Sequence, residues 1–387
     1  MKLFNRHIAP LALVMMIFMT AFTGCERKPL YLAQRGTLYV DVSVYNIQLD
    51  LLWGVDWKTE WQYMWDESLH GPLGYSEPSG VRANVFSLNE SNERFNYTTR
   101  NLPKSGGRVN LTTRQSYDMV FFNNDTEYIL FYSDDANDYL YATTRSNSKT
   151  AYTRAYAHYN QPDQLFGTYL HDLYVTDDPD AYTIHYDANG YPYYLYNITA
   201  SLTPYTFIYL CQVMLLNNND EEGKRIIGCN GISADGLAGG VDLFTRMTDS
   251  LNLVAITQED VKPIQANRPL RLPDGTQAEG DIFAARIMTW GIPGIDPLEK
   301  IMARTEVQPQ DSIEVGIGLT LRNGNVHSIQ RNITELIKRK PAGGIITIVI
   351  DAAEIPDSII GEKPKPGGGF DASVDNWENE IEADIII

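Results

Sequence analysis

Cysteine is the residue type with the clearest chemistry in this chain of 387 residues. Cys25 ends the motif Thr23-Gly24-Cys25, which follows a basic N-terminal region and an apolar run over residues 11–22. A small residue followed by cysteine at this place is typical of bacterial lipoprotein signals, and the run is too short for a spanning helix. Residues 1–24 are therefore predicted to be a signal peptide, with Cys25 acylated and inserted in lipid. The alternative is an ordinary signal that is cleaved at another small residue.

Two further cysteines, Cys211 and Cys229, could form a disulfide after secretion. Apolar runs before and after residues 217–223, which have turn composition, suggest a β-hairpin centred on Asp220. Each cysteine lies nine positions from that centre, so a regular hairpin would place them opposite each other and close enough to be bridged. The alternative is that both are small buried hydrophobic residues.

A cluster of tryptophans offers a possible binding chemistry. Trp53, Trp57, Trp61 and Trp65 recur every four residues, and exposed indole rings could form a platform on which sugar rings stack. The alternative is that these rings pack a long loop against the protein, since the segment directly follows a predicted strand.

Catalytic motifs are missing from the sequence. None of the six histidines has metal-ligand spacing, and neither a G-x-S-x-G motif nor a Walker loop is present. Aspartate-rich runs at 134–138 and 177–180 could bind calcium but are more often solvated turns. A pair of carboxylates that cleaves glycosides is an alternative that the sequence leaves open, because the distance between two acidic side chains cannot be read from a sequence. We therefore expect no enzyme activity, no metal and no cofactor.

Net charge limits the possible partners. The formal charge is −18, and it becomes more negative once Lys2 and Arg6 leave with the signal. Such a surface repels phosphate groups, so neither nucleic acid nor anionic lipid is expected as a partner.

Strand patterns dominate the rest of the chain. Residues 37–45 alternate strictly, with Leu38, Val40, Val42 and Val44 on one face. Similar tyrosine-rich or β-branched runs predict strands at 81–88, 117–122, 128–132, 152–159, 169–175, 182–186, 193–202, 205–216, 226–232, 282–290, 313–321 and 345–350. The only clear helix pattern covers residues 334–340. These patterns predict an all-β fold built from sandwiches.

Turn and linker composition divides the chain. Residues 25–36 form a linker after the lipid, and an interruption at 187–192 separates an N-terminal sandwich, 37–190, from a C-terminal sandwich, 191–360. Residues 361–369 are rich in glycine and proline and read as a flexible linker.

The final segment, 370–387, is unusually apolar for a chain terminus. Its alternation predicts strands that must bury one side, either on their own domain or by addition to another subunit. The residues with which such a tail would pair or fill pockets are Phe370, Val374, Trp377, Ile381, Ile385 and Ile387.

Several motifs occur together in a familiar order. They are Gly106-Gly107-Arg108-Val109-Asn110-Leu111, then the run 117–127 with Tyr117-Asp118 and Asn124-Asp125-Thr126-Glu127, the run 282–291, Asn332-Ile333-Thr334, and the ending 367–377. Together with the lipid signal they resemble a Bacteroidetes lipoprotein family of unknown function, which is similar to the minor subunits of the fimbrillin superfamily of type V pili. The resemblance covers nearly all of the mature chain.

The resemblance implies two tandem transthyretin-like β-sandwich domains and a lipid-anchored place in the outer membrane, at the cell surface or on a fimbria. It also implies that the partners are other fimbrial subunits, with a host or bacterial surface ligand as a further possibility. In polymerising fimbrillins an arginine-specific protease removes the first strand, and the tail of another subunit fills the groove. Here no arginine follows the strand 37–45 until Arg82, which favours an accessory, anchor or tip subunit. The alternative function is a surface glycan-binding lipoprotein that uses the tryptophan cluster.

Overall fold

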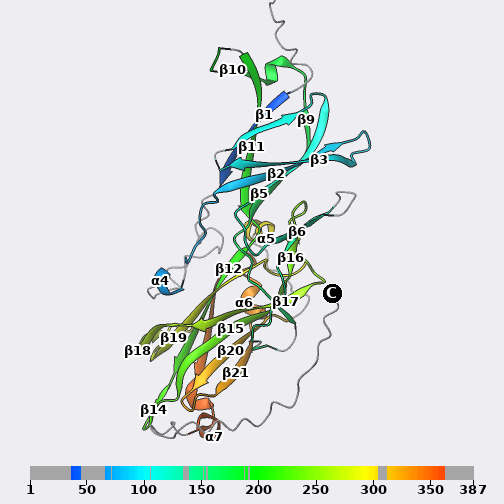
Figure 1. Ribbon diagram of the computed structural model, residues 1–387. Helices are drawn as coiled ribbons and strands as arrows, with labels where there is room; N and C mark the ends of the chain where they lie inside the picture. The colour runs from blue at the N-terminus through cyan, green and yellow to red at the C-terminus, as the bar shows by residue number, and fades with distance from the viewer. Residues whose placement is uncertain are drawn as a thin grey trace, which may run out of the picture.

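A computed structural model describes residues 36–44, 66–70, 72–104, 106–133, 139–150, 152–153, 156–186, 188–190, 192–303 and 312–361. Strands make up most of this part of the chain and lie in two lobes, one with β1, β2, β3, β5 and β9 and one with β12, β15 and β17–β22 (Figure 1). The predicted all-β, sandwich-like architecture is confirmed. None of the helices within these ranges is long and apolar enough to cross a membrane.

The first lobe is a single curved sheet with eight strands, in the order β3-β2-β5-β9-β11-β1-β4, with β10 also paired to β11. Most neighbours are antiparallel, but β1 and β11 run parallel. The strands are β1 (Gly36–Val44), β2 (Gly80–Leu88), β3 (Arg94–Pro103), β4 (Gly107–Leu111), β5 (Gln115–Asn123), β9 (Phe166–Val175), β10 (Thr183–Tyr186) and β11 (Pro192–Pro204).

Alternation along these strands builds a core inside the curved sheet. On β5, Tyr117, Met119 and Phe121 point inward, while Val120 and Phe122 point to the opposite face, as the two-residue period of a strand requires. We call the inner group the first core; it consists of Val81, Ala83, Val85, Leu102, Val109, Leu111, Tyr117, Met119, Phe121, Phe166, Val175, Ile198, Ala200 and Leu202.

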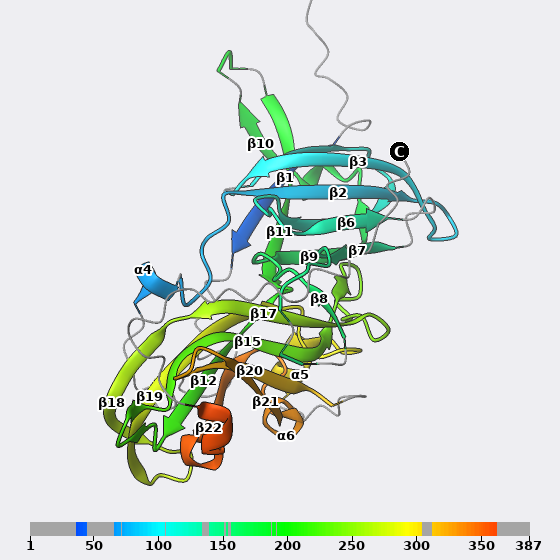
Figure 2. The same ribbon diagram turned by 60° about the horizontal axis from the view of Figure 1, so that its bottom comes forward.

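The second lobe is a sandwich of two sheets (Figure 2). One has the order β18-β19-β12-β22 and the other β21-β20-β15-β17-β8. Their strands are β8 (Ala157–Tyr159), β12 (Phe207–Leu216), β15 (Ile226–Ala238), β17 (Leu253–Val261), β18 (Pro263–Arg271), β19 (Gln277–Thr289), β20 (Glu314–Leu321), β21 (Val326–Asn332) and β22 (Gly344–Asp351). The two sheets enclose the second core, which includes Val213, Ile232, Ile256, Ile287, Ile317 and Ile348.

A small sheet joins the two lobes. Strands β6 (Leu130–Ser133), β7 (Leu140–Thr143) and β16 (Gly240–Asp242) pair across a large sequence separation. Their inner side chains pack with the second face of β5, and we call this group the junction core: Phe86, Val120, Phe122, Ile129, Leu140, Ala142, Leu165, Tyr205, Ala238, Val241, Leu243, Phe244 and Trp290.

Strands on each side of residue 190, the predicted domain boundary, pair with strands of the other predicted domain. Strand β11 lies after residue 190 but pairs with β1, β9 and β10 in the first sheet. Strand β8 lies before it but pairs in parallel with β17 of the second lobe. The division into 37–190 and 191–360 stays a prediction.

Helices are few and short in the described part of the chain: α4 (Glu67–His70), α5 (Pro297–Ala303), α6 (Thr334–Ile337) and α7 (Asp357–Ile360). The helix predicted over 334–340 is confirmed in its first turn as α6. The glycine-rich stretch 236–240 contains a β-bulge, because the pairing of β15 with β17 shifts between Asp235 and Leu237 around Gly236, whose φ is +81°.

The long hairpin predicted around Asp220 is wrong. Only β13 (Asn219–Asp220) and β14 (Gly223–Lys224) pair there, and the chains on either side then separate into different sheets. The reason is that both flanking runs carry apolar side chains toward a shared core, so they pack face to face instead of pairing edge to edge. Cys211 therefore lies opposite Ala285 and Ile346, whereas Cys229 lies opposite Val261 and Leu319.

Candidate functional site: the β1 slot

Strand β1 comes first in the described chain yet lies in the interior of its sheet. On one side, Thr37–Val44 pairs in parallel with Leu195–Leu202 of β11. On the other side, Gly36–Val40 pairs with Gly107–Leu111 of β4 in antiparallel orientation. The first half of β1 is thus paired on both edges and its second half with β11 alone, and the two partner strands come from sequence positions far from one another.

The strands beside β1 contribute to the first core. Val109 and Leu111 of β4 and Ile198, Ala200 and Leu202 of β11 are all at most 6% exposed. Val40, Val42 and Val44 take the register positions opposite Ile198, Ala200 and Leu202, so the alternation read from the sequence matches the alternation of its neighbour.

This arrangement defines a slot, the β1 slot, bounded by the facing edges of β4 and β11. Without β1, both edges would present unpaired N–H and C=O groups beside apolar side chains. A second strand is the ligand that suits such a slot, because main-chain hydrogen bonds supply affinity and alternate side chains fill the pockets. In this structure the slot holds the chain's own β1 by main-chain pairing.

A buried acid stabilises the same sheet away from the slot. The Asp118 side chain on β5 is 2% exposed and accepts hydrogen bonds from Arg94 Nε at 2.7 Å and from the Tyr169 hydroxyl at 2.6 Å. Its other oxygen lies 2.9 Å from His171 Nδ1 and accepts from the Asp172 amide at 3.0 Å. Burial by itself would raise the pKa of Asp118, but these hydrogen bonds outweigh it and hold the pKa below its ordinary value.

Arg94 also connects this sheet to the second half of the chain. Its guanidinium carbon lies 3.7 Å from the centre of the Phe244 ring, in the loop after β16. The Arg94 guanidinium therefore contacts a carboxylate and an aromatic ring at the same time. Both interactions are stronger when the groups are shielded from water.

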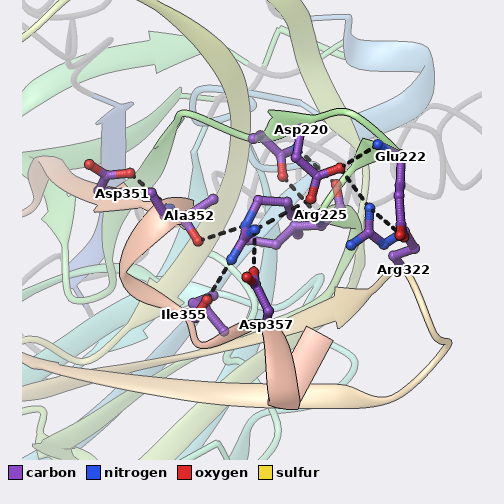
Figure 3. A network of polar contacts seen from close by, with 11 residues as sticks. Asp220, Glu222, Arg225, Arg322, Asp351, Ala352, Ile355 and Asp357 are labelled. Atoms are coloured by element: carbon purple, nitrogen blue, oxygen red, sulfur yellow. Dashed lines mark hydrogen bonds and ion pairs between the residues drawn. The ribbon is translucent and has the colours of Figure 1, made fainter. Parts of the chain in front are cut away.

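A second polar cluster fixes the chain just before the predicted tail (Figure 3). Arg225 donates from Nε to Ala352 O at 3.2 Å, from Nη2 to Ile355 O at 2.6 Å, and from Nη1 to Asp357 Oδ1 at 2.7 Å. We call this set the arginine clamp. It holds the short 3₁₀ turn η3 (Ala352–Glu354) and the start of α7 against the end of the second sandwich.

A neighbouring arginine completes the cluster. Arg322 Nη1 lies 2.7 Å from Asp220 Oδ1 and 3.3 Å from Glu222 Oε2, and Asp220 Oδ2 lies 3.4 Å from Arg225 Nη1. The hydrogen bond from Arg322 lowers the pKa of Asp220. A chain of ion pairs thus runs from Arg322 through Asp220 and Arg225 to Asp357, and it links the β13–β14 turn to α7.

Most of the predicted site residues lie outside the described residues. These are Cys25, the tryptophans Trp53, Trp57, Trp61 and Trp65, and the tail residues Phe370, Val374, Trp377, Ile381, Ile385 and Ile387. Within the described part, Cys211 and Cys229 are both free thiols in the second core, and burial raises the pKa of each to about 12. Their strands belong to opposite sheets, so the hairpin geometry on which the disulfide prediction depended is absent.

Sequence reasoning missed both polar clusters. From the sequence, Tyr117-Asp118 is recognised only as part of a motif. An acidic residue at a strand position that faces a core is itself a signal that a buried cation is nearby, because buried charges are paired. Arg225 follows a turn and gives no comparable signal. In the described part of the chain no group of three or more histidine, cysteine, aspartate or glutamate side chains is placed to hold a metal.

Comparison with known proteins gives three results. No curated protein matches the chain. Among solved structures, it is similar to one of a putative adhesin from Bacteroides ovatus (13% identity, TM-score 0.47, covering 86% of this chain and 99% of the other). It is also similar to the fimbrial anchor protein Mfa2 from Porphyromonas gingivalis (9% identity, TM-score 0.38, covering 81% and 90%). Residues 70–220, from α4 to β13, match the family described as Domain of unknown function (DUF5119).

Proposed function

We propose that this protein is a non-catalytic accessory, anchor or tip subunit of a cell-surface fimbria, held in the outer membrane by acylated Cys25. The observation that carries the proposal is the β1 slot: β1 fills it between β4 and β11, and no arginine follows β1 until Arg82. The motif order that resembles fimbrial accessory subunits and the all-β sandwich fold support the same reading.

A filled slot has a consequence for assembly. A subunit that keeps β1 cannot accept a strand from another subunit at this position, because both neighbouring edges are already paired. It can still donate its own tail, 370–387, to the slot of a different subunit. Such a protein would end a fibre or attach to it and would not extend it.

Crosslinking in native cells tests the proposal. A photoreactive residue in place of Ile385 should capture a different fimbrial protein, since the tail would lie in that protein's slot. The same residue in place of Tyr186, which is 67% exposed on β10, is the control and should not capture that protein. Purely intramolecular products from position 385 would overturn the donor role.

A further inference from the structure

The outer face of the small sheet β6-β7-β16 carries a row of side chains that the strand-exchange function does not use. Phe131, Ala142 and Val241 lie at one register level and point into the junction core. At the next level, Tyr141 lies between Tyr132 and Asp242. These three side chains therefore point to the outer face. Tyr132 is 52% exposed there.

Two tyrosines on this face form a flat aromatic surface. The rings of Tyr139 and Tyr141 are stacked, with centroids 5.4 Å apart and planes 15° from parallel, and Tyr139 is 40% exposed. Gly240 on the adjacent strand leaves room for the Tyr141 ring, because a Cβ at that position would collide with the Tyr141 hydroxyl. We call Tyr132, Tyr139, Tyr141, Asp242 and Asp249 the tyrosine face.

Two carboxylates are fixed beside these rings. Asp249 Oδ2 accepts from the Tyr141 hydroxyl at 2.7 Å, and its Oδ1 accepts from the amides of Leu251 at 2.8 Å and Asn252 at 3.1 Å. Asp242 Oδ1 likewise accepts from backbone amides of the following turn. Main-chain donors hold both carboxyl groups in place, so these two acidic side chains are a fixed part of the face.

The Tyr139 hydroxyl is close enough to these carboxylates to be affected by their charge. Burial raises the pKa of Tyr139 to about 12, and the charges of Asp249 and Asp242 act in the same direction. Two exposed apolar residues lie next to these carboxylates in the backbone. Leu251, whose amide donates to Asp249, is 94% exposed, and Met247, whose carbonyl accepts from the Asp242 amide, is 42% exposed.

We propose that the tyrosine face binds a positively charged side chain, arginine or lysine, of a basic segment in a protein partner. Charge complementarity favours this occupant, because the face carries the acids Asp242 and Asp249 beside electron-rich aromatic rings and the whole chain has a formal charge of −18. An anionic partner would be repelled from the same surface.

The chain itself already uses this combination to hold a cation. Inside the molecule, the Arg94 guanidinium lies 3.7 Å from the Phe244 ring centre and binds the Asp118 carboxylate at 2.7 Å. The tyrosine face presents the same two elements, an aromatic plane and a fixed carboxylate, to solvent.

Peptide binding tests the inference. The full mature chain is titrated into a fluorescein-labelled peptide, Gly-Arg-Gly-Arg-Gly, and anisotropy is followed at low and at high salt. We expect saturable binding that weakens with salt, and a loss of roughly fivefold in affinity for Tyr139→Leu and for Asp249→Asn. Tyr139→Phe keeps the ring and should keep most of the affinity.

Matched controls separate the face from the general acidity of the chain. Tyr174→Leu removes a tyrosine that is 53% exposed on β9, and Asp274→Asn removes an acid from a distant turn. Neither should change the affinity. Thermal melts verify that each variant is folded.

Three outcomes would overturn the inference. One is no binding of the peptide by the wild type at millimolar concentration. Another is an equal loss of affinity in the control variants. The third is binding of a neutral probe, cellohexaose, that depends on Tyr139 while the arginine peptide does not bind, which would make the face a sugar platform.

Discussion

Strands β1 in the first lobe and β22 in the second lobe each run parallel to one neighbour in an otherwise antiparallel sheet, but the two strands are held differently. In the first lobe, β1 runs parallel to β11 and is enclosed on its other side by β4. In the second lobe, β22 runs parallel to β12 and has no second strand neighbour in the described part of the chain. One strand is enclosed, and the other is at an edge.

In the second lobe, polar contacts hold the chain that follows the edge strand β22. The chain turns directly after β22 into η3 and α7, and the arginine clamp holds both through two main-chain carbonyls and a carboxylate. In the first lobe the β1 slot holds its strand by main-chain pairing on two sides. The position of β1 therefore depends on main-chain pairing with β4 and β11, whereas the chain after β22 is fastened by the side chain of Arg225.

Removing β1 should have the largest effect. Deletion of residues 36–44 leaves two unpaired strand edges beside the first core, which should cost at least about 5 kcal/mol, comparable to the stability of a whole domain. We expect urea unfolding to become biphasic, with the first lobe lost and the second retained. A synthetic peptide of residues 36–44, added in trans, should restore the first transition; a single unchanged transition would contradict the slot.

Breaking the arginine clamp should have the next largest effect. Arg225→Met removes four hydrogen bonds and leaves the carbonyls of Ala352 and Ile355 without this donor, so we expect a loss of about 2–3 kcal/mol in the free energy of unfolding. Arg271→Met, at an exposed position on β18, is the matched control and should stay within about 0.5 kcal/mol of the wild type. Equal small effects of both substitutions would show that β22 needs no clamp.

Asp118→Asn tests the buried acid in the first lobe. We expect a loss of about 2–3 kcal/mol near pH 7, because Arg94 loses its partner charge while some hydrogen bonds to the amide remain. The pKa of Asp118 in the folded state lies below the ordinary value of 3.8, so its contribution is present above that pH and is lost as the pH falls through the folded pKa. The stability gap between wild type and variant should therefore narrow from pH 5 to pH 2; a constant gap would refute this role.

A smaller loss of stability is expected at the contact between Tyr152, from the first half of the chain, and glycines of the second sandwich. The Tyr152 ring, 3% exposed, lies over Gly231 and Gly318 on the outer face of the second sandwich, and a Cβ at Gly318 would collide with it. Gly318→Ala should cost about 1–3 kcal/mol through overpacking. Gly228→Ala, where the nearest side-chain atom would be 3.7 Å from the new methyl, should cost less, and denaturant midpoints of the two variants compare them directly.

Alternation along the sequence predicted strands well where one face is buried. The runs 37–45, 81–88 and 117–122 correspond to β1, β2 and β5. Strand β3 escaped prediction because nearly all of Arg94–Pro103 is exposed, so it carries no apolar period. A strand at the edge of a sheet with both faces wet is recognised only from its partner.

Pairing and the site were much harder to predict than strands. Which strand lies beside β1 depends on contacts between residues 37–44 and 195–202, and nothing local encodes them. The hairpin prediction failed for the same reason, since local turn composition at 217–223 says nothing about which sheets the flanking runs enter. The arginine clamp depends on Arg225 meeting carbonyls at 352 and 355, which only the folded chain brings together.

The most direct test is the identity of the mature protein on the cell surface. Mass spectrometry of protein purified from the surface of its native cells should find a chain that begins at lipid-modified Cys25 and contains residues 36–44. That result would agree with a subunit that keeps β1 in its own slot. A mature chain that begins between residues 45 and 81 would show that β1 is removed and that the slot accepts a strand from another subunit, which would contradict the proposed non-polymerising role.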